Sequence, residues 1–404
     1  MSSIQHKNYS FDEIAVDNFW EYLRIPSEQP NVNYEAFVRF LQFQAVCLDL
    51  PIQIHLSMSN KPVVVLTWVG TEPTLAAILL YNHMDVVPLR EINWSNNPFG
   101  GDTDDQKTYA RTSAHKKTAS IQCLEAVRRL KNSGVTLKRT IHLCFAPDEE
   151  LKGLEGMAGF ITTNEISKLN IGFVLDSGLP SPTNEFTVFN GERCIWKIRV
   201  HCPGNAQHGL LLDCTAGDKM TRVLNKFFAF RMQQKQILKE DPNLTIGDII
   251  TINLTNIESG IQNFLVPTGF VLTFDCLIPP ENVDVVLFQE AITKWCKDVG
   301  YDTWIEYAVQ EPQIKPTKVD GSNKYWVAFK EAIDKLGLKM KTQIFPGYTD
   351  CRNFRLFGIP ALSFTPINNT PVSLHEDGHH LTLDAFLKGI EIYYNIILSL
   401  GNVV

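Results

Sequence analysis

Short, almost wholly apolar runs of strand length constrain the fold of this chain most strongly. They lie at 62–68, 76–82, 140–146 and 171–176. Helical patterns precede or separate them, at 11–24, 33–48, 118–132 and 153–163. Strands without a polar face must be covered on both sides, so this alternation predicts an α/β sheet with helices on both faces. In such sheets the functional residues lie at the carboxyl ends of the strands.

The middle of the chain follows a different pattern, typical of an α+β domain. Strands are expected there at 195–200, 249–254 and 269–276, and long helices near 216–235 and 283–298. The first pattern then returns, with helices at 323–336 and 381–399 and strands at 342–345 and 361–364. We therefore predict a discontinuous domain of residues 1–190 and 311–404, interrupted by an inserted domain of residues 191–310.

Composition excludes several classes of protein. Hydrophobic residues make up 44% and charged residues 20% of the 404-residue chain, as in folded globular proteins. The 37 Lys and Arg against 44 Asp and Glu give a net charge of −7, and the basic residues are scattered, so nucleic acid is not an expected partner. No run approaches about 18 apolar residues and the start lacks a secretory pattern, so we expect no membrane association and a cytoplasmic location. Nine cysteines without a CxxC pair predict free thiols, with neither disulfides nor a cysteine zinc site.

Two groups of polar residues follow predicted buried strands. His83 and Asp85 come after the strand 76–82, and a carboxylate beside an imidazole is a common way to orient a metal-ligating histidine. A histidine in an ordinary loop is the alternative. Glu149 and Glu150 end the acidic run that follows the strand 140–146. Consecutive acids cannot be buried unpaired, so this run is either a solvated loop or a cation site with a general base.

Two further polar patches lie near the C-terminus. The run PGYTDCRNF contains Asp350 and Arg352, and the planar guanidinium of Arg352 suits a carboxylate ligand. Taken alone, this run is also typical of a polar turn. The run LHEDGHHL offers His375 as a metal ligand, with His379 and His380 at the expected start of the last helix. A purely structural histidine is the alternative at each of these positions.

Taken in chain order, these motifs resemble aminoacylase I and the wider dinuclear-zinc exopeptidases. The resemblance rests on HxDVVP, YAR followed by SIQCLEAVRRLK, TIHLCFAPDEE, FVLDSG, TDCR and TPVSLHEDGH, and it extends over almost the whole chain. TVFNGER and INLTNIESG fit aminoacylase I in particular. The resemblance implies a zinc-exopeptidase-like catalytic domain with an inserted lid domain through which two subunits form a homodimer. The implied reaction is hydrolysis of an N-acyl-L-amino acid to a carboxylate and a free L-amino acid.

The resemblance also implies roles for individual residues of the metal site. Glu149 corresponds to the general base that takes a proton from a zinc-activated water. Glu150 and His375 correspond to ligands of one zinc ion, and His83 to a ligand of the other. Asp85 corresponds to the carboxylate that supports His83.

Substrate contacts follow from the same resemblance. Arg352 matches the residue that binds the substrate carboxylate. His208 matches a histidine that reaches from the partner's lid and stabilises the oxyanion, although a surface loop residue is the alternative. At the position of a substrate-binding asparagine this chain has Phe264, with Asn263 one residue early. A shift of one residue in a strand turns a side chain to the opposite face.

The metal ligands depart from the family pattern at two positions. His115 replaces the bridging aspartate, and a neutral imidazole has one lone pair, so it does not normally bridge two ions. Thr112 replaces a glycine of the same loop. Ser177 replaces a glutamate ligand, and the adjacent Asp176 is expected to point away from that position. With Glu150 as the remaining acidic ligand, we expect one zinc ion rather than two.

Two hypotheses follow. In the first, the chain is an amidohydrolase of the aminoacylase type with an altered, impaired metal site, in which His115, Glu150 and His375 hold one zinc ion and Glu149 acts as base. In the second, it is an inactive homologue that binds acyl-amino acids or a partner subunit, including an active paralogue. The retained polar residues favour the enzyme, whereas the departures from the family pattern favour the binding protein.

Overall fold

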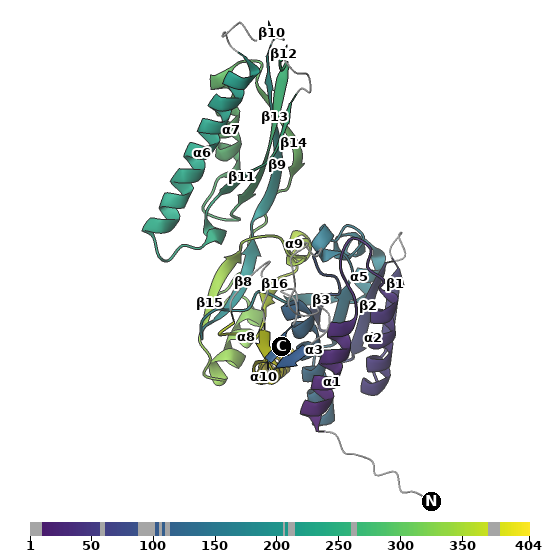
Figure 1. Ribbon diagram of the computed structural model, residues 1–404. Coiled ribbons are helices and arrows are strands. Elements are labelled where there is room, and N and C mark those ends of the chain that lie inside the picture. Colours follow the sequence, from purple (N-terminus) through teal and green to yellow (C-terminus); the bar gives the residue numbers. More distant parts are fainter. Residues whose placement is uncertain are drawn as a thin grey trace, which may run out of the picture. The chain divides into compact units, whose positions relative to one another are not determined.

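The computed structural model describes residues 10–56, 61–87, 102–104, 107–109, 114–204, 207–208, 215–259, 265–370 and 380–404. These residues form two compact units. The first contains the chain up to residue 190 together with 317–342 and 349–404, and the second contains 191–316 and 343–348. Figure 1 shows both units, coloured along the sequence.

The main sheet of the first unit has eight strands. In spatial order they are β1 (Ile52–Leu56), β2 (Pro62–Trp68), β6 (Ile141–Ala146), β3 (Ala77–His83), β7 (Ile171–Asp176), β16 (Ala361–Phe364), β8 (Phe186–Glu192) and β15 (Met340–Phe345). β3 runs parallel to β6 and β7, and β16 runs parallel to β7, whereas β1, β2 and β8 pair antiparallel with their neighbours. The carboxyl ends of β6, β3, β7 and β16 therefore lie at one edge of a mixed sheet.

Helices cover both faces of this sheet. One face packs on α1 (Phe11–Arg24), α2 (Glu35–Leu48), α3 (Ala114–Asn132), α8 (Lys324–Lys335) and α10 (Leu383–Leu400). The other face packs on the short helices α4 (Met157–Phe160), α5 (Asn164–Lys168) and α9 (Cys351–Leu356). In β2, Val64 and Leu66 belong to the first core, whereas Val63 and Val65 belong to the second. This alternation explains why the strand has no polar face.

Three short strands of the first unit form a separate sheet. In spatial order they are β17 (His380–Thr382), β5 (Lys107–Tyr109) and β4 (Asp102–Asp104), and the pairs β17–β5 and β5–β4 are antiparallel.

The second unit has its own core. Its antiparallel sheet has the order β11 (Thr251–Ser259), β13 (Gly269–Ile278), β9 (Cys194–Pro203) and β14 (Trp304–Gln310). α6 (Ala216–Glu240) and α7 (Val285–Val299) pack on the sheet through Val223, Phe227, Phe288 and Ile292 (Figure 1). β10 (Gln207–His208) pairs with β12 (Leu265–Val266), and the single turn η2 (Ile246–Asp248) precedes β11.

Several elements differ from their predicted ranges. α3 begins at Ala114 rather than at 118, and only 157–160 of the expected helix 153–163 is α-helical. The last helix begins at Leu383, because His380–Thr382 forms β17, so His380 does not start a helix. Pattern analysis also missed β1, β8, β14 and α9. β1 and β14 are edge strands and β8 lies next to an edge strand, and the hydrophobic pattern is weaker at such positions.

All of the described cysteines carry free thiols. Cys47 is exposed and the others are buried. No helix in the described ranges is long and apolar enough to cross a membrane.

Candidate metal centre

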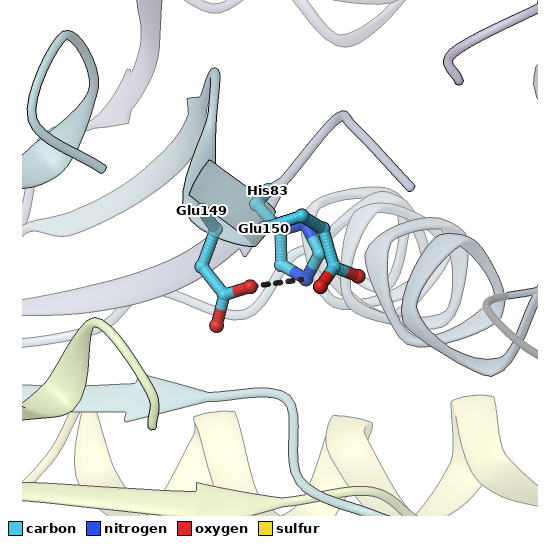
Figure 2. Close-up of side chains that lie close together, drawn as sticks. All are labelled: His83, Glu149 and Glu150. Carbon is cyan, nitrogen blue, oxygen red and sulfur yellow. Dashed lines mark ion pairs between the residues drawn. The ribbon is translucent and has the colours of Figure 1, made fainter. Parts of the chain in front are cut away.

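His83, Glu149 and Glu150 converge at the carboxyl ends of β3 and β6. His83 is the last residue of β3 and pairs in register with Ala146, the last residue of β6. The chain then turns at Asp148, whose φ of 61° lies in the left-handed region, into the single turn η1 (Glu149–Leu151). One ligand atom of each of the three residues lies within 4.8 Å of those of the other two. Figure 2 shows the three side chains, which we call the ligand cluster.

Asp85 holds all three residues of the ligand cluster. Its carboxylate accepts hydrogen bonds from the backbone N–H groups of Glu149 and Glu150, each at 3.1 Å, and from Nε2 of Gln29 at 2.9 Å. Oδ1 of Asp85 also lies 3.3 Å from Nδ1 of His83. A carboxylate at Nδ1 fixes the imidazole orientation and leaves Nε2 available as a ligand.

Nε2 of His83 points into the cluster. The His83 side chain is 1% exposed, and its Nε2 has no hydrogen-bond partner among the described residues. It lies 3.8 Å from Oε2 of Glu149, the interaction drawn as a dashed line in Figure 2. A buried polar atom without a partner requires an explanation, and an imidazole nitrogen beside two carboxylates fits a divalent cation such as zinc.

A second layer of hydrogen bonds supports Asp85. Nε2 of Gln29 also donates to Asp148 at 2.8 Å, and the Tyr34 hydroxyl donates to the same Asp148 carboxylate at 2.7 Å. Lys61 forms an ion pair with Asp148. Because Asp148 and Glu149 are 3% and 7% exposed, the interpretation of the acidic run as a solvated loop is wrong. Donors from distant parts of the chain compensate for the burial of Asp148.

The electrostatics of the cluster reflect an excess of buried negative charge. Burial raises the pKa of Glu149 to about 8, although His83 and Lys116 oppose the shift. Burial alone would lower the pKa of His83, but Glu149 and Asp85 raise it to about 10. Both shifts have the sign expected of a site that lacks positive charge.

Lys116 supplies positive charge from the opposite side of the centre. It lies in the first turn of α3, its side chain is buried, and Nζ donates to the carbonyl oxygen of Ser177 at 2.8 Å. Burial alone would lower the pKa of Lys116, but Asp176, Glu149 and Glu150 raise it above its usual value. Asp176 ends β7, and burial raises its pKa although Lys116 opposes the shift.

Cys351 completes this side of the centre. Its Sγ donates to Oδ2 of Asp176 at 3.6 Å, and Oγ of Ser177 donates to Oδ1 of Asp176 at 3.5 Å. We call Lys116, Asp176, Ser177 and Cys351 the lysine side of the centre.

The TDCR motif is buried rather than a polar turn. Asp350 and Arg352 are 0% and 5% exposed and lie at the start of α9. Asp350 accepts hydrogen bonds from the Tyr81 hydroxyl and, at 2.9 Å, from Nδ2 of Asn353. Burial raises the pKa of Asp350 to about 7, and Asp176 adds to the shift. The polar-turn interpretation is therefore wrong, because both side chains are buried and Asp350 accepts a hydrogen bond from Tyr81.

Other predicted site residues are described only in part or not at all. The backbone of His115 lies in α3 and that of His208 in β10, but their side chains lie outside the described residues. His375 and His379 lie outside them as well, as do Thr112, Asn263 and Phe264. The roles assigned to these residues stay predictions.

Sequence analysis missed Lys116, Gln29 and Tyr34. The burial of Lys116 has no signal in the sequence, because residues 116–128 of α3 are buried all round and include polar and charged side chains. Gln29 has no such signal either. It reaches Asp85 because backbone hydrogen bonds attach its loop to Val86, just after β3.

Comparisons with known proteins agree with this architecture. Residues 79–399 match the model of peptidase family M20/M25/M40. The chain belongs to this family. Aminoacylase-1 of Mus musculus is 40% identical over 393 residues, which cover 96% of each chain. Aminoacylase-1 of Dictyostelium discoideum is 38% identical over 416 residues, which cover both chains completely.

Solved M20 structures share the fold. An M20 family metallo-carboxypeptidase from Sulfolobus solfataricus superposes with a TM-score of 0.73 at 16% identity, covering 96% of this chain and 99% of that one. A dinuclear metal-binding M20 peptidase from Bacillus subtilis gives a TM-score of 0.66 at 14% identity, covering 96% and 98%. The predicted family and the α/β fold with an inserted antiparallel sheet are thus confirmed. The chain is an aminoacylase-1-like metallohydrolase of the M20 family.

Proposed function

We propose that this chain hydrolyses N-acyl-L-amino acids at a remodelled centre that holds one zinc ion. The observation that carries the proposal is the position of Glu149, a buried carboxylate 3.8 Å from Nε2 of His83 in a chain 40% identical to aminoacylase-1. When bound, the ion supplies Lewis-acid polarisation of the amide carbonyl. His83 and Glu150 are its candidate ligands in the described part of the chain, with His115 and His375 as further candidates.

Glu149 moves the proton in this proposal. Its carboxylate takes a proton from the water that attacks the acyl carbon and delivers that proton to the amine nitrogen as the C–N bond breaks. Burial raises the pKa of Glu149, which favours the protonated form that this carboxyl must adopt between the two steps. Asp85 positions Glu149 through its backbone N–H. Arg352 as the carboxylate-binding residue, His208 as the oxyanion donor and the homodimer through the inserted unit complete the proposal.

A specific observation favours a second candidate function, that of an inactive binding protein. The acidic ligands expected at 115 and 177 are a histidine and a serine, and a buried ammonium contacts the backbone of Ser177. Under this candidate the chain binds N-acyl-amino acids or a partner subunit without turnover.

Hydrolysis of a panel of N-acyl-L-amino acids by zinc-supplemented protein separates the two candidates. We expect turnover in the unaltered chain and a loss of about 100-fold or more in Glu149→Gln, because the base is removed while its shape is kept. Glu165→Gln is the matched control, since Glu165 is an exposed glutamate that pairs with Lys168 at 2.6 Å. Binding of the panel without turnover above the Glu149→Gln level would establish the second candidate.

A further inference from the structure

Lys116 is an unusual residue to find at the carboxyl edge of a sheet beside acidic ligands. Its side chain crosses from the first turn of α3 to the end of β7, where Nζ donates to the Ser177 carbonyl oxygen at 2.8 Å. The residue is 9% exposed. An ammonium removed from water to this extent must be compensated by anions and hydrogen-bond acceptors around it.

The compensating anions come from two elements of the same sheet edge. Asp176, at the end of β7, and Glu149 and Glu150, in η1, all attract the ammonium. Two of these three carboxylates also belong to the ligand cluster. Lys116 therefore shares its counter-charges with whatever cation the ligand cluster holds.

The two sides of the centre offer different coordination. The ligand cluster brings an imidazole nitrogen without a partner and two carboxylates within 4.8 Å of one another, which suits one divalent ion. On the lysine side, the Asp176 carboxylate already accepts from the Ser177 hydroxyl and from the Cys351 thiol, and the ammonium points at the Ser177 backbone. A second divalent ion there would meet a like charge at short range.

We infer that the Lys116 ammonium is a built-in cation that takes the place of a second metal ion, so that the centre binds one metal ion per chain, at the ligand cluster. This inference deepens the proposed function and rests on it for the identity of the metal. It differs from a simple loss of ligands, because it predicts that restoring the acidic ligands alone does not restore a second ion.

Zinc content and zinc titration of four full-length variants test this inference without reference to activity. The first is the unaltered chain, expected to hold one zinc ion. The second carries His115→Asp and Ser177→Glu, which supply the missing carboxylates and are still expected to hold one. The third adds Lys116→Met to those changes and is expected to bind a second ion at least about 100-fold more tightly than the second variant does. The fourth adds Lys116→Arg instead, which keeps the cation, and is expected to match the second.

Two results would overturn the inference. One is tight binding of two zinc ions by the unaltered chain or by the double variant with Lys116 in place. The other is no gain of a second ion in the folded triple variant with Lys116→Met. Neither result bears on turnover of N-acyl-amino acids, so failure of the inference and failure of the proposed hydrolysis are distinguishable, although both depend on the number of zinc ions.

The single variants keep the test decisive if the combined ones do not fold. Lys116→Met alone removes a like charge near the ligand cluster and is expected to raise the affinity for the first zinc ion by about 10-fold, whereas Lys116→Arg alone leaves it within about threefold. A lysine whose charge does not act on the ligand cluster would give no such gain. An unchanged or lower zinc affinity in folded Lys116→Met therefore contradicts the inference.

Discussion

Beyond the ends of β3 and β6, Asp85 contacts a histidine and two glutamates whose ligand atoms lie close together, whereas beyond the neighbouring β7 the Asp176 carboxylate faces an ammonium. The two sides lie at one edge of one sheet, and β3 separates β6 from β7. The first side supplies ligands for an external ion. The second carries its positive charge on the chain itself.

This difference indicates which part of the centre depends on metal. On the ligand side, the Gln29 amide donates to both Asp85 and Asp148. These hydrogen bonds orient the ligands but do not neutralise their negative charge. On the lysine side, the covalently attached ammonium needs no ligand set. Changes on the ligand side should therefore lower metal affinity, whereas removal of the ammonium on the lysine side should raise it and, with acidic ligands restored, permit a second ion.

The largest effect of this kind is expected for Asp85→Asn. An amide cannot accept from two backbone N–H groups and from His83 as a carboxylate does, so the imidazole loses the partner that orients Nε2. Substitution of such a supporting carboxylate typically lowers metal affinity by about 10-fold to 100-fold. Competition with a zinc chelator of known affinity measures the change.

Asp176→Asn is the matched variant on the lysine side. It removes the same type of charge from a similarly buried residue, but Asp176 is outside the ligand cluster and already faces the Lys116 ammonium, so we expect the zinc affinity to change by less than about threefold. Equal losses in the two variants would show that the two sides of the centre are not distinct in the way we describe.

Much of the fold followed from the sequence because its signals are local. The apolar runs that became β2, β3, β6 and β7 identified the sheet, and their last residues identified His83 and Glu149 as candidates. A parallel pair of strands brings two such ends together whatever the intervening sequence.

The contacts of Lys116 and Gln29 could not be predicted in the same way. A long flexible side chain reaches whichever anion the tertiary structure places within range, and only the folded sheet places Asp176 and Ser177 beside α3. Gln29 lies in a loop whose position depends on its pairing with the segment after β3. The partners of both residues lie far away in sequence, so no local pattern encodes them.

A smaller effect is expected one step farther from the metal, in Gln29→Leu. The change removes the amide that donates to both Asp85 and Asp148, so Asp85 keeps its backbone donors but loses a side-chain partner. We expect the zinc affinity to fall by about threefold to 10-fold, less than in Asp85→Asn. Gln44→Leu is the control, because Gln44 of α2 is a buried glutamine that donates to Asn18 in α1 and accepts from Arg128 in α3. Both variants should lose stability, and zinc affinity that falls equally in both would contradict a specific role for Gln29.

A last effect, on stability rather than on metal affinity, concerns a histidine of the same sheet that has no carboxylate neighbour among the described residues. His142 lies in β6 near the amino end of the strand, accepts from or donates to the Thr67 hydroxyl at 3.0 Å, and lies 3.0 Å from the Leu169 carbonyl oxygen. Burial lowers the pKa of His142, whereas the carboxylates around His83 raise the pKa of that histidine. The two histidines thus distinguish plain burial from burial among anions.

The sign of the His142 effect follows from proton linkage. Because the pKa of His142 is lowered in the folded state, the unfolded chain binds more protons below pH 6.5, and folding stability is lost as the pH falls through that value. We expect His142→Gln, which keeps a donor and an acceptor but does not titrate, to reduce the loss of unfolding free energy between pH 7 and pH 5 by on the order of 1 kcal/mol. Urea unfolding at both pH values measures it. An identical pH dependence in the two proteins would mean that His142 is solvated well enough to titrate normally, and the contrast with His83 would then rest on the carboxylates alone.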